Sequence, residues 1–95
     1  MGSYRLTNNA KDDLRRIYHW GLDTFGEAQA DKYYDDLFQQ FEKITLNPLS
    51  YPSVDDFRRG YRKCTTKADT IYFRIVGEAV EISAVIGHQD LKNWL

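Results

Sequence analysis

The spacing of apolar residues changes once along this chain, and that change limits the folds open to it. From Ala10 to Ile44 apolar side chains recur every three or four residues, as on one face of a helix. From Thr70 to Ile86 they alternate with other side chains, as in strands with one buried face. The order predicts helices first and a sheet afterwards, which is an α+β arrangement.

The helical part is predicted to form a hairpin of two helices. A short strand at Ser3–Leu6 precedes it, and Thr7 or Asn8 is expected to cap the first helix. The first buried stripe is Ala10, Leu14, Ile17, Tyr18, Leu22 and Phe25, and the second is Ala30, Tyr34, Leu37, Phe38, Phe41 and Ile44. Gly26 supplies a left-handed stop between them, and Asn47 with Pro48 ends the second helix. So short a joint requires the helices to fold back on each other.

Residues 48–57 have neither periodicity and are expected to form a crossing loop anchored by a few apolar side chains. Three strands are predicted between Arg58 and His88, with a tight turn at Gly77 and Glu78. The side chains expected to meet the helices are Ile71, Phe73 and Ile75, then Val80, Ile82, Ala84 and Ile86. Asp90 can cap a last helical turn that carries Leu91, Trp94 and Leu95. The predicted fold is β-α-α-β-β-β, a helical hairpin packed on one face of a small antiparallel sheet.

Length and composition indicate one domain, residues 1–95, because 95 residues with 42% apolar content can bury only one core. Cys64 is the single cysteine, which excludes an internal disulfide and favours a reducing cytoplasm. No apolar run reaches the roughly 20 residues of a membrane span, and no long apolar segment near the N-terminus suggests export. No metal-ligand spacing is present, so neither a metal nor a cofactor is expected.

The balanced net charge hides a polarised chain. Between Arg58 and Arg74 there are six Lys or Arg and one acid, a formal charge of +5 in a chain whose total is −1. The remainder therefore carries −6, and the basic segment is predicted to bind an acidic partner. Three partners fit: an acidic protein segment, an acidic protein surface, or a nucleic-acid backbone.

Most other candidate residues have a structural explanation. His19 is expected to be partly buried between Tyr18 and Trp20, and Cys64 is expected to be inert because nothing nearby lowers its pKa strongly. The acid pairs at 12–13 and 35–36 are expected to offset the helix dipole or to keep the helix surface soluble, rather than to act as catalytic pairs.

Several segments together resemble the ParE branch of the ParE/RelE toxin superfamily. They are Tyr4–Thr7, Asp13 with Leu14, Phe25 with Gly26, Arg59–Lys63, Ile71–Ile75 and the end from Val80 to Asp90. The resemblance covers essentially the whole chain. It implies the toxin half of a bacterial toxin–antitoxin pair, neutralised by a ParD-like antitoxin. For ParE it implies poisoning of DNA gyrase, and for the RelE branch it implies cutting mRNA on the ribosome.

The chemistry of RNA cleavage helps to choose between the branches. Attack by a 2′-hydroxyl needs a base, an acid and cations for the phosphorane charge. The candidates for that alternative are His88, Tyr61, Tyr72 and Arg62, with Asp90 two residues beyond His88. RelE-like nucleases tend to carry a basic residue just after the last strand and an aromatic or acid–base residue near the C-terminus, where this chain has Gln89 and Leu95. This departure favours a gyrase inhibitor without catalytic residues.

The residues predicted to bind antitoxin or target are the basic ones of the first two C-terminal strands and the aromatic ones beside them. They are Arg58, Arg59, Tyr61, Arg62, Lys63, Tyr72, Arg74 and Trp94. Tyr61, Tyr72, Val85 and Trp94 are expected to leave apolar surface open on the sheet, where a disordered antitoxin segment could fold. No groove-reading helix or stacking signature indicates sequence-specific binding of nucleic acid.

Overall fold

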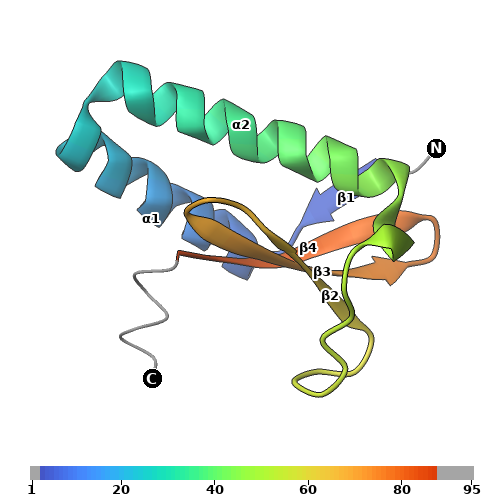
Figure 1. The fold of residues 1–95 in the computed structure, drawn as a ribbon. Coiled ribbons are helices and arrows are strands. Elements are labelled where there is room, and N and C mark those ends of the chain that lie inside the picture. The colour runs from blue at the N-terminus through green and yellow to red at the C-terminus, as the bar shows by residue number, and fades with distance from the viewer. Residues whose placement is uncertain (1–2, 88–95) are drawn as a thin grey trace.

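The computed structural model of the chain describes residues 3–87 (Figure 1). In chain order it contains β1 (Ser3–Leu6), α1 (Asn8–Phe25), α2 (Glu27–Leu46), a short 3-10 helix (Pro48–Ser50), β2 (Tyr61–Thr65), β3 (Asp69–Val76) and β4 (Ala79–Gly87). The helices lie side by side over one face of the sheet (Figure 1). None of the helices within residues 3–87 is long and apolar enough to cross a membrane. The predicted last helical turn, with Asp90, Leu91, Trp94 and Leu95, lies outside the described residues.

The predicted β-α-α-β-β-β fold is confirmed, with one difference in strand direction. The strand order is β1-β4-β3-β2, and β2, β3 and β4 are antiparallel neighbours, as predicted. β1 instead runs parallel to β4, with Ser3 opposite Ala79 and Leu6 opposite Ile82, so the sheet is mixed. A strand of four residues is too short for its pattern to show which neighbour it will join or in which direction.

The helix boundaries follow local signals in the sequence. The Thr7 side chain accepts a hydrogen bond from the Ala10 N–H at 3.1 Å and caps α1. Gly26 has φ 90° and ψ 172°, so its φ is positive as predicted, but its ψ lies outside the left-handed helical region. This extended glycine ends α1 and lets α2 begin at the next residue.

The core lies between the two helices and the near face of the sheet. The largest side chains in it are almost fully buried: Leu14, Phe41, Ile44, Ile71, Phe73, Ile82 and Val85. Burying each of these is worth roughly 1.5–3 kcal/mol. The predicted stripe of α2 is confirmed. In α1 the last member of the predicted stripe, Phe25, is 61% exposed, because the helix runs past the end of the sheet.

A β-bulge in β4 reverses the faces predicted for its second half. Tyr72 pairs with Ala84 but Phe73 pairs with Ile82, so Ser83 is an extra residue in β4. Beyond it Val85 faces the core and is 0% exposed, whereas Ala84 and Ile86 are only half-buried. The prediction that Ala84 and Ile86 meet the helices is therefore wrong, and so is the prediction that Val85 leaves apolar surface open.

Three further predictions about burial fail at the margins of the core. Ile75, near the end of β3, is 40% exposed. His19 is exposed on α1 instead of partly buried. In the loop only Tyr51 is a clear anchor, with its ring 5.7 Å from that of Phe73, while Leu49 and Phe57 are 67% and 80% exposed. Apolar character alone cannot show where a core of this size ends.

The start of α1 is attached to β4 at the bulge. The carbonyl of Ser83, the extra residue, accepts hydrogen bonds from the side chains of Thr7 and Asn9, each at 3.1 Å. The Asp13 carboxylate accepts a buried hydrogen bond from the Val85 N–H at 2.9 Å. These contacts, which we name the α1–β4 clamp, satisfy backbone groups that the bulge would otherwise leave without partners.

We predict that Asp13→Ala destabilises the fold by about 2 kcal/mol, because it leaves the buried Val85 N–H without an acceptor. Asp12→Ala is the matched control, since Asp12 is an exposed neighbour that forms an ion pair with the exposed Arg15 three residues along the same helix. That control should change stability by no more than about 0.5 kcal/mol. Urea unfolding of both variants measures the difference. Equal losses in the two variants would show that the clamp contributes nothing particular.

Candidate functional site

Alternation along β2 divides the predicted binding residues between the two faces of the sheet. Tyr61 lies opposite Arg74 and Lys63 opposite Tyr72 in the register of β2 and β3. Because side chains alternate along a strand, these four share the face that points away from the helices. The structure thus brings half of the predicted set together on one open face.

Arg62 lies on the other face of β2 and has a structural partner. It is opposite the buried Phe73, and its Nη1 donates a hydrogen bond of 2.7 Å to the carbonyl oxygen of Tyr51. The contact holds the start of the loop against β2. Arg62 therefore stabilises the loop conformation. Replacing it would disturb the loop, so it is unsuitable for testing whether the open face binds a partner.

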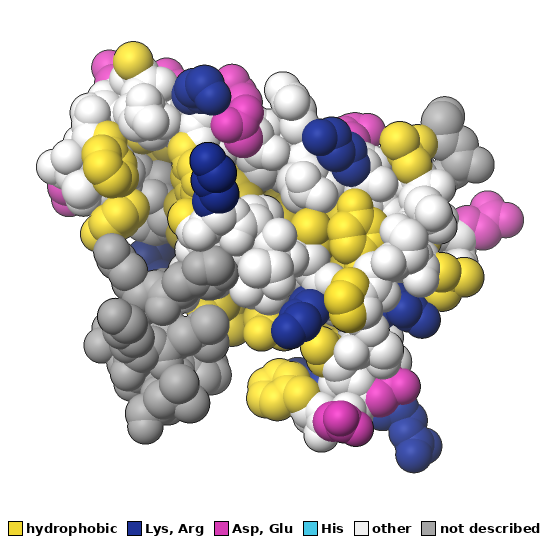
Figure 2. Space-filling model, viewed as in Figure 1, with side chains coloured by type: hydrophobic (Ala, Val, Ile, Leu, Met, Phe, Trp, Pro, Cys, Tyr) yellow, Lys and Arg dark blue, Asp and Glu magenta, His cyan; other side chains and the backbone are white. Residues whose placement is uncertain are grey.

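The two arginines before β2 belong to a loop and not to the predicted strand. Arg58 and Arg59 precede the first residue of β2, Tyr61, and both are exposed. The loop projects away from the rest of the fold, and Figure 2 shows hydrophobic, acidic and basic side chains side by side over it. Its exposed aromatic residue, Phe57, was not predicted as a binding residue.

Five side chains form a continuous surface on the open face, which we name the aromatic–basic surface: Phe57, Arg58, Tyr61, Tyr72 and Arg74. The Cζ atoms of Arg58 and Arg74 lie 4.9 and 5.7 Å from the centroid of the Tyr61 ring. The rings of Phe57 and Tyr72 are 6.3 Å apart. Such cation–π and ring contacts are worth about 0.5–1 kcal/mol each at exposed sites, so they hold the side chains in place.

Ion pairs with Glu81 fix the β3 end of this surface. Arg74 Nε donates to Glu81 Oε1 at 2.8 Å, and Arg5 Nη2 donates to Oε2 at 3.1 Å. The Glu81 side chain is only 13% exposed. The hydrogen bond from Arg74, assisted by that from Arg5, lowers the pKa of Glu81. Arg74 is thus paired with Glu81, and its Cζ lies 5.7 Å from the centroid of the Tyr61 ring.

The described residues offer little acid–base chemistry near this surface. A base works best with a pKa near the operating pH, and the pKa of Glu81 is shifted away from it. Burial raises the pKa of the Cys64 thiol, which agrees with the inert role predicted for it. Within residues 3–87 no group of three or more potential ligands could hold a metal ion. His88, Gln89, Trp94 and Leu95 lie outside the described residues.

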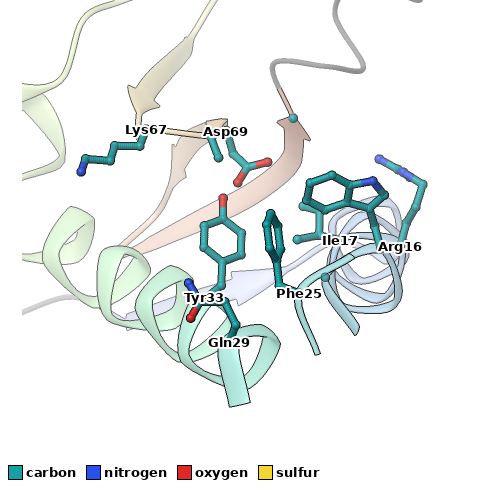
Figure 3. A pocket seen from close by; sticks show the side chains of 11 residues that line it. Arg16, Ile17, Phe25, Gln29, Tyr33, Lys67 and Asp69 are labelled. Atoms are coloured by element: carbon teal, nitrogen blue, oxygen red, sulfur yellow. The ribbon is translucent and has the colours of Figure 1, made fainter. Parts of the chain in front are cut away.

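A second surface, which the sequence did not predict, is an apolar groove of about 570 Å³ at the far end of the helical hairpin. The groove lies between α1, α2 and the β2–β3 turn. Its lining includes Ile17, Trp20 and Phe25 of α1, Tyr33 of α2, and Lys67 and Ala68 of the turn (Figure 3). Groove volumes of this order are typical of ligand and peptide sites.

Two features distinguish the groove from the rest of the helical surface. Trp20 and Phe25 pack edge to face at 5.5 Å, yet they remain 47% and 61% exposed. The Tyr33 hydroxyl is buried and has no hydrogen-bond partner within residues 3–87. The signal in the sequence was the pair of large aromatic residues Trp20 and Phe25 near the end of α1. Helical periodicity placed Phe25 in the buried stripe and left Trp20 outside it.

Comparison with known proteins places the chain in a family. The sequence profile described as "ParE toxin of type II toxin-antitoxin system, parDE" matches residues 4–91. The chain belongs to the ParE toxin family. It is 34% identical to Toxin ParE1 of Caulobacter vibrioides over 97% of this chain and 94% of that protein. It is 29% identical to Toxin ParE1 of Mycobacterium tuberculosis over 93% of this chain and 90% of the relative.

A solved structure of the chromosomal ParDE toxin–antitoxin system from P. aeruginosa has the same fold. Its matching chain superimposes with a TM-score of 0.80 at 22% identity, over 92% of this chain and 96% of that chain. The resemblance noted from the sequence is confirmed. Membership of the ParE family makes this chain the toxin of a type II system and implies a cognate ParD antitoxin.

Proposed function

We propose that this ParE-family toxin inhibits DNA gyrase by binding it in the cytoplasm, and that a ParD-like antitoxin neutralises it. The gyrase target comes from the resemblance to ParE. The observation that carries the binding mode is the aromatic–basic surface, in which Arg58 and Arg74 lie against Tyr61. Hot spots of protein interfaces are enriched in aromatic and arginine side chains, and here such side chains are held in place by their mutual contacts.

The alternative, a ribosome-dependent mRNA endonuclease of the RelE type, requires more chemistry than this surface provides. Its cations suit a phosphorane, but Glu81 is ion-paired to two arginines and its lowered pKa makes it a weak base. Two arginines, Arg58 and Arg74, lie against the Tyr61 ring. This arrangement fits the recognition of a protein partner as well as it fits catalysis. Binding without covalent chemistry is therefore the simpler function for these residues.

The purified toxin is expected to inhibit supercoiling of relaxed plasmid by gyrase and to increase the amount of cleaved DNA. Supercoiling gels with and without the antitoxin measure this, and added antitoxin should restore activity. Programmed ribosomes are the contrasting substrate. Cleavage of mRNA in the ribosomal A site, with gyrase unaffected, would assign the toxin to the RelE type and contradict the proposal.

We also propose that the antitoxin binds the apolar groove rather than the open face of the sheet. The open face is the surface proposed above to bind gyrase, and Arg62 lies on the other side of the sheet, where it donates a hydrogen bond to Tyr51. The groove offers the exposed aromatic side chains of Trp20 and Phe25. An amphipathic helix of the antitoxin suits such a site.

Phe25→Ser is expected to weaken antitoxin binding by about tenfold or more, because it removes an exposed aromatic contact from the groove. Leu46→Ser is the matched control, since Leu46 is 70% exposed at the opposite end of α2. Calorimetry of the toxin with its antitoxin measures both variants and should show a negative heat-capacity change. Equal affinity of Phe25→Ser and the unchanged toxin would place the antitoxin elsewhere.

A further inference from the structure

We propose that the loop from Ser53 to Gly60 is the element that anchors the toxin to its target, with Phe57 inserted into an apolar pocket of a protein that carries carboxylates on one side of the pocket. This inference rests on the proposed function and deepens it. It adds the loop and its apolar anchor to the basic residues already expected to bind. It also assigns the partner's chemistry: an apolar pocket bordered by carboxylates.

The loop is held in one conformation by its own hydrogen bonds. The Val54 N–H donates to the Tyr61 carbonyl at 2.9 Å, and the Val54 carbonyl accepts from the N–H groups of Phe57 and Arg58 at 2.9 and 2.7 Å. The Gly60 N–H donates to Asp55 Oδ1 at 2.8 Å, and this bond lowers the pKa of Asp55. An ordered loop loses little conformational entropy on binding, which favours its use as a binding element.

The position of Phe57 distinguishes it from other exposed apolar residues. Leu46 and Leu49 are also about two-thirds exposed or more, and scattered residues of that kind need no explanation. Phe57 is 80% exposed at a projecting loop, and its ring lies 6.3 Å from that of Tyr72. It therefore extends the aromatic–basic surface outward and would be the first apolar group to reach a partner.

The charges of the loop favour a protein partner over a nucleic acid. Asp55 and Asp56 precede Phe57, and Arg58 and Arg59 follow it, so these four charges sum to zero. Two carboxylates beside the anchor would repel a phosphate backbone, which is negative along its whole length, whereas a protein surface can place its carboxylates only on the side of Arg58 and Arg59. A pocket with carboxylates on one side can pair with Arg58 and Arg59 while its apolar floor receives Phe57.

The loop and the apolar groove lie at opposite ends of β2. The loop leads into Tyr61, the first residue of β2, while Thr65, the last, leads into the turn that borders the groove (Figure 1). Separate positions allow a variant at one site to leave the other intact. This gives the proposal a clear test, because a change at Phe57 should affect the target and spare the antitoxin.

The test compares Phe57→Ser with the matched control Leu49→Ser, which removes a residue of similar exposure from the 3-10 helix Pro48–Ser50, outside the segment Ser53–Gly60. Both variants should keep the circular-dichroism spectrum and the antitoxin affinity of the unchanged toxin. We expect Phe57→Ser to need about tenfold more expressed toxin to arrest bacterial growth, and to bind purified gyrase about tenfold more weakly. Leu49→Ser should behave as the unchanged toxin in both assays, and Phe57→Tyr should recover most of the activity.

Every other result either contradicts the role of Phe57 or shows that the gyrase proposal fails while the role of Phe57 can still be judged. Full growth arrest by Phe57→Ser overturns the inference, and so does an equal loss of antitoxin affinity, which would make the loop structural. If the unchanged toxin arrests growth without inhibiting gyrase, the gyrase proposal fails and the growth comparison alone decides the role of Phe57. A toxin that never arrests growth contradicts both the gyrase proposal and the role of Phe57.

A single-stranded RNA oligonucleotide tests the class of partner. If Phe57→Ser loses affinity for this RNA in step with its loss of growth arrest, the assigned protein partner is wrong.

Discussion

The buried hydrogen bond from the Val85 N–H to the Asp13 carboxylate is the contact on which the arrangement of this protein depends. It joins the first turns of α1 to β4 just beyond the bulge at Ser83. The bulge turns Val85 into the core, and the α1–β4 clamp supplies the partners that the irregular backbone needs. With α1 fixed on the sheet, the end of the helical hairpin is held over the β2–β3 turn, and the groove exists between them.

Much of the fold was predictable because its signals are local. Periodicity located both helices, Thr7 and Gly26 marked ends, and alternation found β3 and the first half of β4. What failed depends on contacts distant in sequence. A single inserted residue, Ser83, reversed the faces of β4, and no pattern within the strand distinguishes a bulge from a continued alternation. Direction and partner of the short β1 were equally beyond local reasoning.

The candidate site was only partly predictable for the same reason. Charge clustering drew attention to β2 and β3, and Tyr61, Tyr72 and Arg74 do lie together on the open face. Arg62 lies on the opposite face of β2 because side chains alternate along a strand. Its hydrogen bond to the Tyr51 carbonyl could not be predicted, since it depends on how the loop folds back. Phe57 was missed because the apolar side chains of its loop were expected to anchor the loop, and the groove was missed because Phe25 was placed in the buried stripe of the first helix. Both became visible once Phe25 and Phe57 proved to lie beyond the edge of the core.

The central claim is that target and antitoxin meet the toxin at opposite ends of β2, the target at the Phe57 loop and the antitoxin at the groove. Hydrogen exchange of the toxin's backbone amides, alone and in each complex, tests this most directly. We predict that gyrase slows exchange in residues 53–63 and leaves residues 17–29 unchanged, while the antitoxin slows exchange in residues 17–33 and 66–69. Protection of the same segments by both partners, or of the groove by gyrase, would contradict it.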